Sequence, residues 1–175
     1  MSYDLMVFEP DSDFEQRDHF ANWYAVQTKW GEDHDYSSIE KTTSKLQAWL
    51  LDSMQQFPSI NGTASASIAD ESDFDTEYSI GTELIYCCYT WQHAAKAYEC
   101  AFSLAEKHKV GFYDVSSDTG QVWMPNTKGK LSIVHSSQPN ERQKFWTEAP
   151  PCPECGKKLR TKLAKQCFEC GADWH

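Results

Sequence analysis

Two pairs of cysteines near the C-terminal end of the printed sequence constrain that region more than any other feature constrains the chain. Each pair encloses two residues and is followed by a glycine, and the four cysteines are Cys152, Cys155, Cys167 and Cys170. Two cysteines at this spacing reach one ion from a tight turn, and four thiolates fill the tetrahedral shell of Zn2+. Gly156 and Gly171 permit the positive φ that such turns need. We therefore predict one structural Zn2+ per chain in a zinc ribbon over residues 150–175, with no position open for a catalytic water.

Charge divides the sequence into an acidic body and a basic tail. The net charge is −10, but residues 1–126 contain 7 Lys/Arg against 21 Asp/Glu, whereas residues 127–175 contain 9 against 5. An acidic body repels nucleic acid and suits a basic protein partner. The start of the chain has no basic and apolar leader pattern, and no apolar run reaches the length of a membrane span. We expect a cytoplasmic protein that does not associate with membranes.

The spacing of apolar residues predicts an α+β domain over residues 1–126. Residues 3–8 form a short apolar run typical of a strand, and Asp13 with Gln16 has the spacing of a capping box that begins a first helix. A similar box, Ser44 with Gln47, begins a second helix, and residues 79–89 form one long apolar strand. A third helix and a hairpin over residues 110–125 follow. The order βααβαββ predicts three helices packed on one mostly antiparallel sheet.

Residues 127–149 have the composition of a linker or docking segment between this domain and the ribbon. Short polar and turn-forming stretches surround two apolar groups, residues 131–134 and 145–146. These groups could form an extra edge strand or a docking segment, and we favour a partly ordered linker.

The densest polar cluster of the body directly follows the first predicted helix. A carboxylate–histidine metal or acid/base site, a solvated loop and a recognition loop for a basic partner are all compatible with it. Charge alone favours the solvated loop, since charged loops are common at surfaces. As a partner surface, the cluster offers Trp30, Asp33, His34, Asp35 and Tyr36.

Two further charged segments have a functional and a plain interpretation. Residues 70–77 contain five acids, including Asp73 and Asp75, and could mimic a phosphate backbone before a basic toxin or form an exposed charged loop. Lys157, Lys158 and Arg160 lie between the cysteine pairs and could contact nucleic acid. No aromatic residue lies in that interval to stack on bases, so we favour a solvated hairpin.

Nothing in the sequence marks a catalytic site. The body cysteines, Cys87, Cys88 and Cys100, lie in apolar stretches, which raise thiol pKa and make poor nucleophiles. Such reduced thiols also argue against a disulfide framework. The sequence has no nucleophile elbow, phosphate-binding loop or dinucleotide fingerprint. We expect a protein that is not an enzyme, and an enzyme whose site cannot be seen in one sequence is the third alternative.

Several short segments carry a resemblance over residues 2–125. They are SYDLMVFEP from Ser2, Trp23-Tyr24, WGEDH from Trp30, LQAW from Leu46, FPSING from Phe57, YSIG from Tyr78 and VGFYDV from Val110. In these the chain resembles a family of small bacterial cytosolic proteins of undetermined function. The resemblance implies an association with contact-dependent or secreted toxin systems, in which small acidic proteins act as antidotes. The tail resembles zinc ribbons appended to many unrelated bacterial proteins.

The leading hypothesis is therefore an immunity-like protein that neutralises a basic toxin or effector by occlusion. The alternative is a nucleic-acid- or ribosome-associated accessory protein that uses the basic ribbon.

Overall fold

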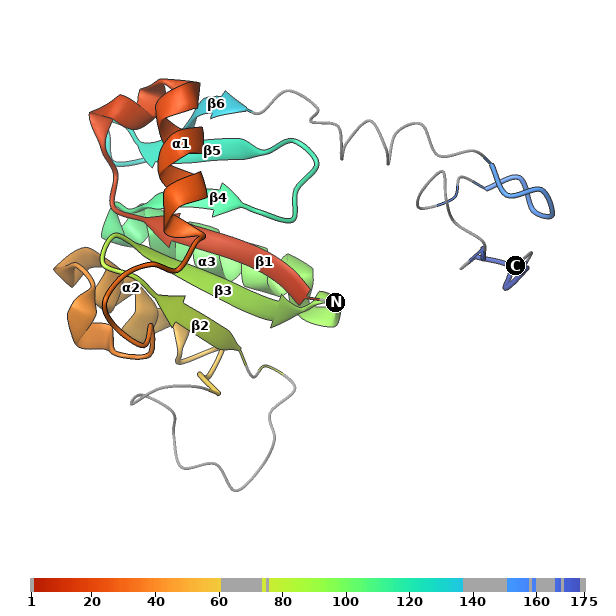
Figure 1. Cartoon of the computed structure of the whole chain (residues 1–175), viewed down its shortest axis with the longest axis horizontal. Helices are drawn as coiled ribbons and strands as arrows, with labels where there is room; N and C mark the ends of the chain where they lie inside the picture. The colour runs from red at the N-terminus through yellow and green to blue at the C-terminus, as the bar shows by residue number, and fades with distance from the viewer. Residues whose placement is uncertain are drawn as a thin grey trace. The chain divides into compact units, whose positions relative to one another are not determined.

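The protein consists of two compact units, Met1–Ser136 and Ser137–His175. A computed structural model describes residues 2–60, 74, 76–136, 151–157, 159, 166–167 and 169–173. Figure 1 shows the helices and strands, all of which belong to the first unit. Each unit is described separately below.

The first unit is an α+β domain built on a six-stranded sheet with the order β2-β3-β1-β4-β5-β6. Every pair of neighbouring strands is antiparallel. The strands are β1 (Ser2–Phe8), β2 (Glu77–Ile80), β3 (Leu84–Thr90), β4 (Gly111–Asp114), β5 (Gln121–Pro125) and β6 (Leu131–Ser136). The helices are α1 (Arg17–Gln27), α2 (Ser44–Ser53) and α3 (Ala94–His108). The predicted class, with three helices and an antiparallel sheet, is confirmed.

Strand β1 lies inside the sheet and divides the core into two parts. Its alternate residues point to opposite faces, because successive side chains of a strand do so. Leu5 and Val7 join the core beneath α2 and α3, whereas Met6 and Phe8 join the core beneath α1. Figure 1 shows α1 on one face of the sheet and α3 on the other.

The larger core joins α2 and α3 to the sheet through Trp49. This side chain has no exposed surface, and its indole Nε1 donates to the carbonyl oxygen of Ala101 in α3 at 3.2 Å. A buried indole N–H needs such a partner. Trp49 thus contributes both apolar burial and a fixed contact between two helices.

Aromatic rings fill the smaller core beneath α1. Phe8, Phe14, Phe20 and Trp23 surround one another, with ring centroids separated by 4.8 Å for Phe14 and Trp23 and by 5.7 Å for Phe20 and Trp23. The Phe8 ring lies over Gly111 of the adjacent strand, where a Cβ atom would come within 2.3 Å of the ring. Only glycine allows this close approach between β1 and β4.

The apolar run over residues 79–89 is two strands instead of the predicted single one. Strand β2 ends at Ile80 and β3 begins at Leu84, and the N–H of Gly81 donates to the Leu84 carbonyl at 2.9 Å to close the reversal. Gly81, Thr82 and Glu83 interrupt the apolar residues at the turn, so the sequence carries a signal for the reversal that the prediction of a single strand does not use. The predicted order βααβαββ therefore lacks this extra strand.

The sheet also extends into the segment predicted as a linker. Residues 131–136 form β6, which pairs with β5 after a turn in which the Asn126 N–H donates to the Lys130 carbonyl at 2.8 Å. Of the two alternatives for residues 131–134, the edge strand agrees with the structure. The predicted domain boundary at residue 126 falls inside the β5–β6 hairpin. Residues 137–150 lie outside the described part of the chain.

Both predicted capping boxes are displaced. Asp11 accepts from the Asp13 N–H at 2.9 Å and caps a 3-10 turn over Ser12–Glu15, and α1 begins only at Arg17. Thr43 caps α2 by accepting from the Leu46 N–H, one residue before the predicted Ser44. Helix α1 ends at Gln27, so Trp30 lies beyond it. A hydroxyl or carboxylate within one turn can perform the same capping role, which is why spacing alone misplaces the end.

Candidate metal centre

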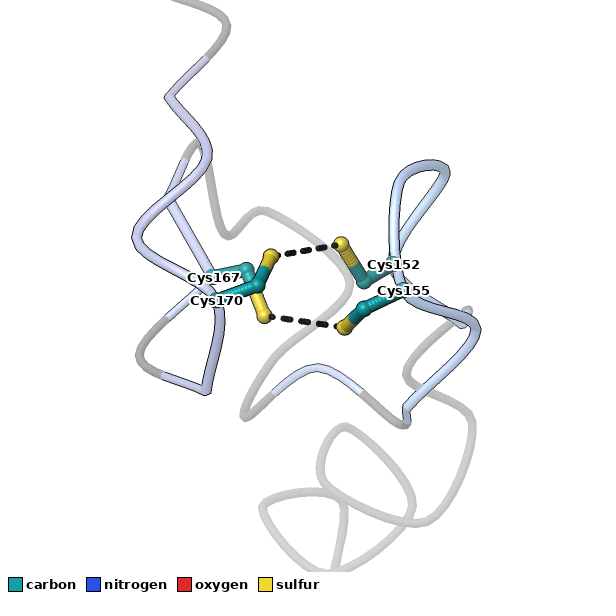
Figure 2. Close-up of side chains that lie close together, drawn as sticks. All are labelled: Cys152, Cys155, Cys167 and Cys170. Atoms are coloured by element: carbon teal, nitrogen blue, oxygen red, sulfur yellow. Dashed lines mark hydrogen bonds between the residues drawn. The ribbon is translucent and has the colours of Figure 1, made fainter.

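The four predicted cysteine ligands meet at one point in the second unit. All four sulfur atoms lie within 4.8 Å of one another. Figure 2 marks two pairs, Cys152 with Cys170 and Cys155 with Cys167, each with sulfurs 3.7 Å apart. A disulfide bond would be about 2.05 Å long. A tetrahedron with metal–sulfur bonds of about 2.3 Å has edges of about 3.8 Å, so these separations fit four thiolates around one ion.

The two cysteine turns repeat the same hydrogen bonds. The Gly156 N–H donates to the Cys152 carbonyl at 2.9 Å, and the Gly171 N–H donates to the Cys167 carbonyl at 2.8 Å. Both glycines have positive φ, 71° and 75°. The first cysteine of each turn also donates its own N–H to the carbonyl oxygen of the residue after the glycine. The Cys152 N–H donates to Lys157 at 2.7 Å, and the Cys167 N–H donates to Ala172 at 2.8 Å. Each turn therefore presents two sulfurs from one rigid local structure.

Backbone dipoles favour thiolate at one of these sulfurs. N–H groups of Cys170 and Glu169 point at Cys167 and lower the pKa of its thiol to about 7. Hydrogen bonds to an anionic sulfur stabilise the charged form, which is the form that binds metal. On the outside, Lys157 forms a 2.7 Å ion pair with Glu169 and so links the two turns.

The described part of the second unit has almost no apolar core. Its buried cluster contains Cys152, Cys167 and Leu159, with Ala172 packed against it. Below about 40 residues, a domain usually needs a metal or disulfides to fold. The cysteines therefore have a structural reason to bind an ion. A shell of four thiolates fits Zn2+ or iron, and it leaves no open position for catalysis by zinc.

Comparison with family models, curated proteins and solved structures finds no match for this chain. Among the described residues, no helix combines the length and the apolar character that crossing a membrane would require. The resemblance noted in the sequence thus remains a prediction.

The polar cluster after α1 is an ordered loop fastened to the β2–β3 turn. Glu32 accepts from the Thr82 N–H at 2.9 Å and from the Thr82 hydroxyl. His34 Nδ1 accepts from the Tyr36 N–H at 3.1 Å, so Nε2 carries the proton and donates to Glu32 at 2.7 Å. The Tyr36 hydroxyl accepts from the Glu32 N–H at 2.6 Å. Glu32 and His34 are thus occupied within the loop, which is a structural network instead of a freely solvated segment.

Burial raises the pKa of Glu32, but hydrogen bonds from Thr82 and His34 outweigh it and leave the pKa below its usual value. Trp30 and Tyr36 both have left-handed φ, 53° and 57°, which non-glycine residues adopt only when their surroundings hold them. The network around Glu32 supplies that restraint.

The structure separates the predicted partner residues into inward and outward groups. His34 and Tyr36 belong to the internal network, whereas Asp33 and Asp35 are exposed and Trp30 is 38% exposed. Asp73, Asp75, Lys158 and Arg160 lie outside the described residues. The Glu32–Thr82 contact was missed from the sequence, because no local pattern relates two residues so far apart in the chain.

Burial raises the pKa of the three body thiols, Cys87, Cys88 and Cys100. This agrees with the sequence argument that none of them is an activated nucleophile.

Proposed function

We propose that this protein is a non-enzymatic binding protein whose acidic first unit occludes a basic protein partner. Its C-terminal unit is then a small appendage folded around one structural Zn2+. In the form suggested by the sequence resemblance, the partner is a toxin or effector and the protein is its immunity protein.

The observation that carries this proposal is the rigid loop over residues 30–36. Glu32 accepts from Thr82, and the Tyr36 carbonyl accepts from the Ile80 N–H at 2.8 Å, so the loop is fastened to β2 and its turn, while Asp33 and Asp35 face the solvent beside the half-exposed Trp30. Neither aspartate forms an ion pair with any described residue. An aromatic anchor flanked by exposed carboxylates, ordered before binding, loses little entropy on association and attracts a basic surface.

The alternative, nucleic-acid binding by the ribbon, has less support from the described residues. Lys157, the one predicted contact residue in that part, is already paired with Glu169.

The test is capture of the partner from the native host at moderate salt, followed by binding measurements with the purified pair. We expect a basic protein to co-purify. The double variant Asp33→Asn, Asp35→Asn should slow its association several-fold, about 3- to 10-fold at low salt. The control double variant Glu99→Gln, Asp118→Asn removes the same charge from exposed positions elsewhere and should change the rate less. Equal slowing by both variants, or recovery of nucleic acid alone, would contradict the proposal.

A further inference from the structure

Helix α1 covers only part of its face of the sheet. In Figure 1 it lies in front of β4 and β5, and no helix lies in front of β2 and β3. The strand register places Asp4 beside Cys88 and Met6 beside Tyr86, and Glu77 and Ser79 of β2 pair with Cys88 and Tyr86. Because paired residues point to the same face, five side chains share this area, which we call the open sheet face: Asp4, Glu77, Ser79, Tyr86 and Cys88. Glu77 is exposed and the other four are partly buried.

Asp4 gives the open sheet face a negative charge that the described residues do not neutralise. Its Oδ2 accepts from the Tyr86 hydroxyl at 3.2 Å, and its buried Oδ1 has no hydrogen-bond partner. No described cation forms an ion pair with it. The backbone of Asp4 is held on both sides by Ser116, which donates to its carbonyl at 3.2 Å and accepts from its N–H at 2.8 Å. A fixed, partly buried carboxylate in this state is stabilised by a nearby positive charge.

Two groups near Asp4 carry no charge at physiological pH. Burial, together with Asp4 and Glu77, raises the pKa of the Cys88 thiol to about 12. Burial, Tyr113 and Asp4 raise the pKa of Tyr24 in α1 to about 12 as well. Both groups therefore stay neutral at physiological pH and add no charge of their own.

Aromatic rings border this carboxylate. Trp30 meets the Tyr86 ring edge-on, with centroids 5.8 Å apart, and continues the open sheet face to the loop over residues 30–36. Ring faces beside a carboxylate favour a cation with a flat, weakly hydrated surface. Guanidinium has that surface and stacks on aromatic rings, whereas the ammonium of lysine is compact and strongly hydrated.

We propose that the open sheet face binds an arginine side chain of the basic partner, with the guanidinium beside Asp4 and stacked on one of the two perpendicular rings, Tyr86 and Trp30. This inference rests on the proposed function and identifies the face and the group that it recognises. The occupant follows from charge complementarity and from the aromatic border.

The test is an NMR titration of the full chain with zinc bound, using a capped hexa-arginine peptide and, separately, a capped hexa-lysine peptide. We expect the arginine peptide to shift the Trp30 indole signal and the amides of residues 77–79 and 86–88. Asp4→Asn keeps an acceptor for Tyr86 and removes the charge, so it should leave the fold intact and weaken binding roughly tenfold. The control Asp118→Asn removes the same charge from an exposed turn and should weaken binding less than about twofold.

Equal weakening by Asp4→Asn and Asp118→Asn, or equal affinity for lysine and arginine peptides, would overturn the assignment. Trp30→Ala provides a second variant that changes no charge, and unchanged arginine binding in it would also overturn the site. The two proposals fail separately. A captured partner that binds Asp4→Asn with unchanged affinity contradicts the site alone, whereas specific peptide binding without any captured protein contradicts the function alone.

Discussion

Trp49 shows how much stability a single residue contributes in this domain. We predict that Trp49→Ala lowers the free energy of unfolding of the first unit by about 3–5 kcal/mol, the range for large buried aromatic side chains. The change removes the packing and leaves a cavity between α2, α3 and the sheet. Urea unfolding followed by far-UV circular dichroism measures it.

Trp91→Ala is the matched control, because that side chain is 49% exposed and contacts mainly Tyr3. It should cost about 1 kcal/mol or less. Similar losses for both variants would mean that Trp49 does not hold α2 and α3 to the sheet.

Single residues were predictable where their pattern is local. The cysteines follow from a spacing of two residues. The Glu32–Thr82 contact and the Asp4–Tyr86 pair were not predictable, because they join residues that only the folded sheet brings together. The candidate metal ligands could be identified in advance, whereas the hydrogen-bond partner of an acid could not.

At the scale of an element, the loop over residues 30–36 depends on Glu32. We predict that Glu32→Ala destabilises the first unit by about 1–3 kcal/mol at pH 7, because Thr82 and His34 lose a charged acceptor. The folded-state pKa of Glu32 is lowered. The stabilisation is therefore complete above the unfolded-state value of about 4.3 and is lost as pH falls through the lower folded-state value.

The measurement is urea unfolding of both proteins between pH 3 and pH 7. The stability difference should be constant above about pH 5 and shrink in acid. Asp33→Ala, at the exposed neighbouring position, should change stability by less than about 0.5 kcal/mol. A Glu32→Ala difference that grows in acid would contradict the account.

Elements were predictable when their ends carry a signal. Strand β1, helix α3 and the β4–β5 hairpin are bounded by charged or turn-forming residues and lie where the sequence predicts them. The β2–β3 reversal was missed although Gly81, Thr82 and Glu83 mark it, because the prediction joins the apolar residues on either side of them into one strand. Strand β6 was only one of the alternatives for residues 131–134, since its side chains are mixed and its pairing with β5 defines it.

At the scale of the whole molecule, the two units should respond differently to metal removal. We predict one equivalent of Zn2+ per chain, and chelation should unfold the second unit because the core formed by its described residues consists of little more than the ligands and Leu159. The first unit has its own core and should keep its unfolding transition. Metal analysis and circular dichroism before and after chelation measure both effects.

Cys167→Ser should reproduce the loss of metal, whereas Cys100→Ser in α3 should keep it. Metal affinity should also fall with decreasing pH, since protons compete for the thiolates. If the metal analysis finds iron in place of zinc, the site stands and only the identity of the ion changes. Much less than one equivalent of any metal would contradict the site.

The inner position of β1 also affects how the chain leaves the ribosome. Its two partners, β3 and β4, are both synthesised later, so the nascent strand carries two unpaired edges while α1 and α2 are being made, and one until α3 is complete. Such an apolar strand invites pairing with other chains. Four exposed acids follow it at once: Asp11, Asp13, Glu15 and Asp18. Placed beside an apolar segment, like charges act as gatekeepers against aggregation, and these acids protect β1 until translation delivers its neighbours.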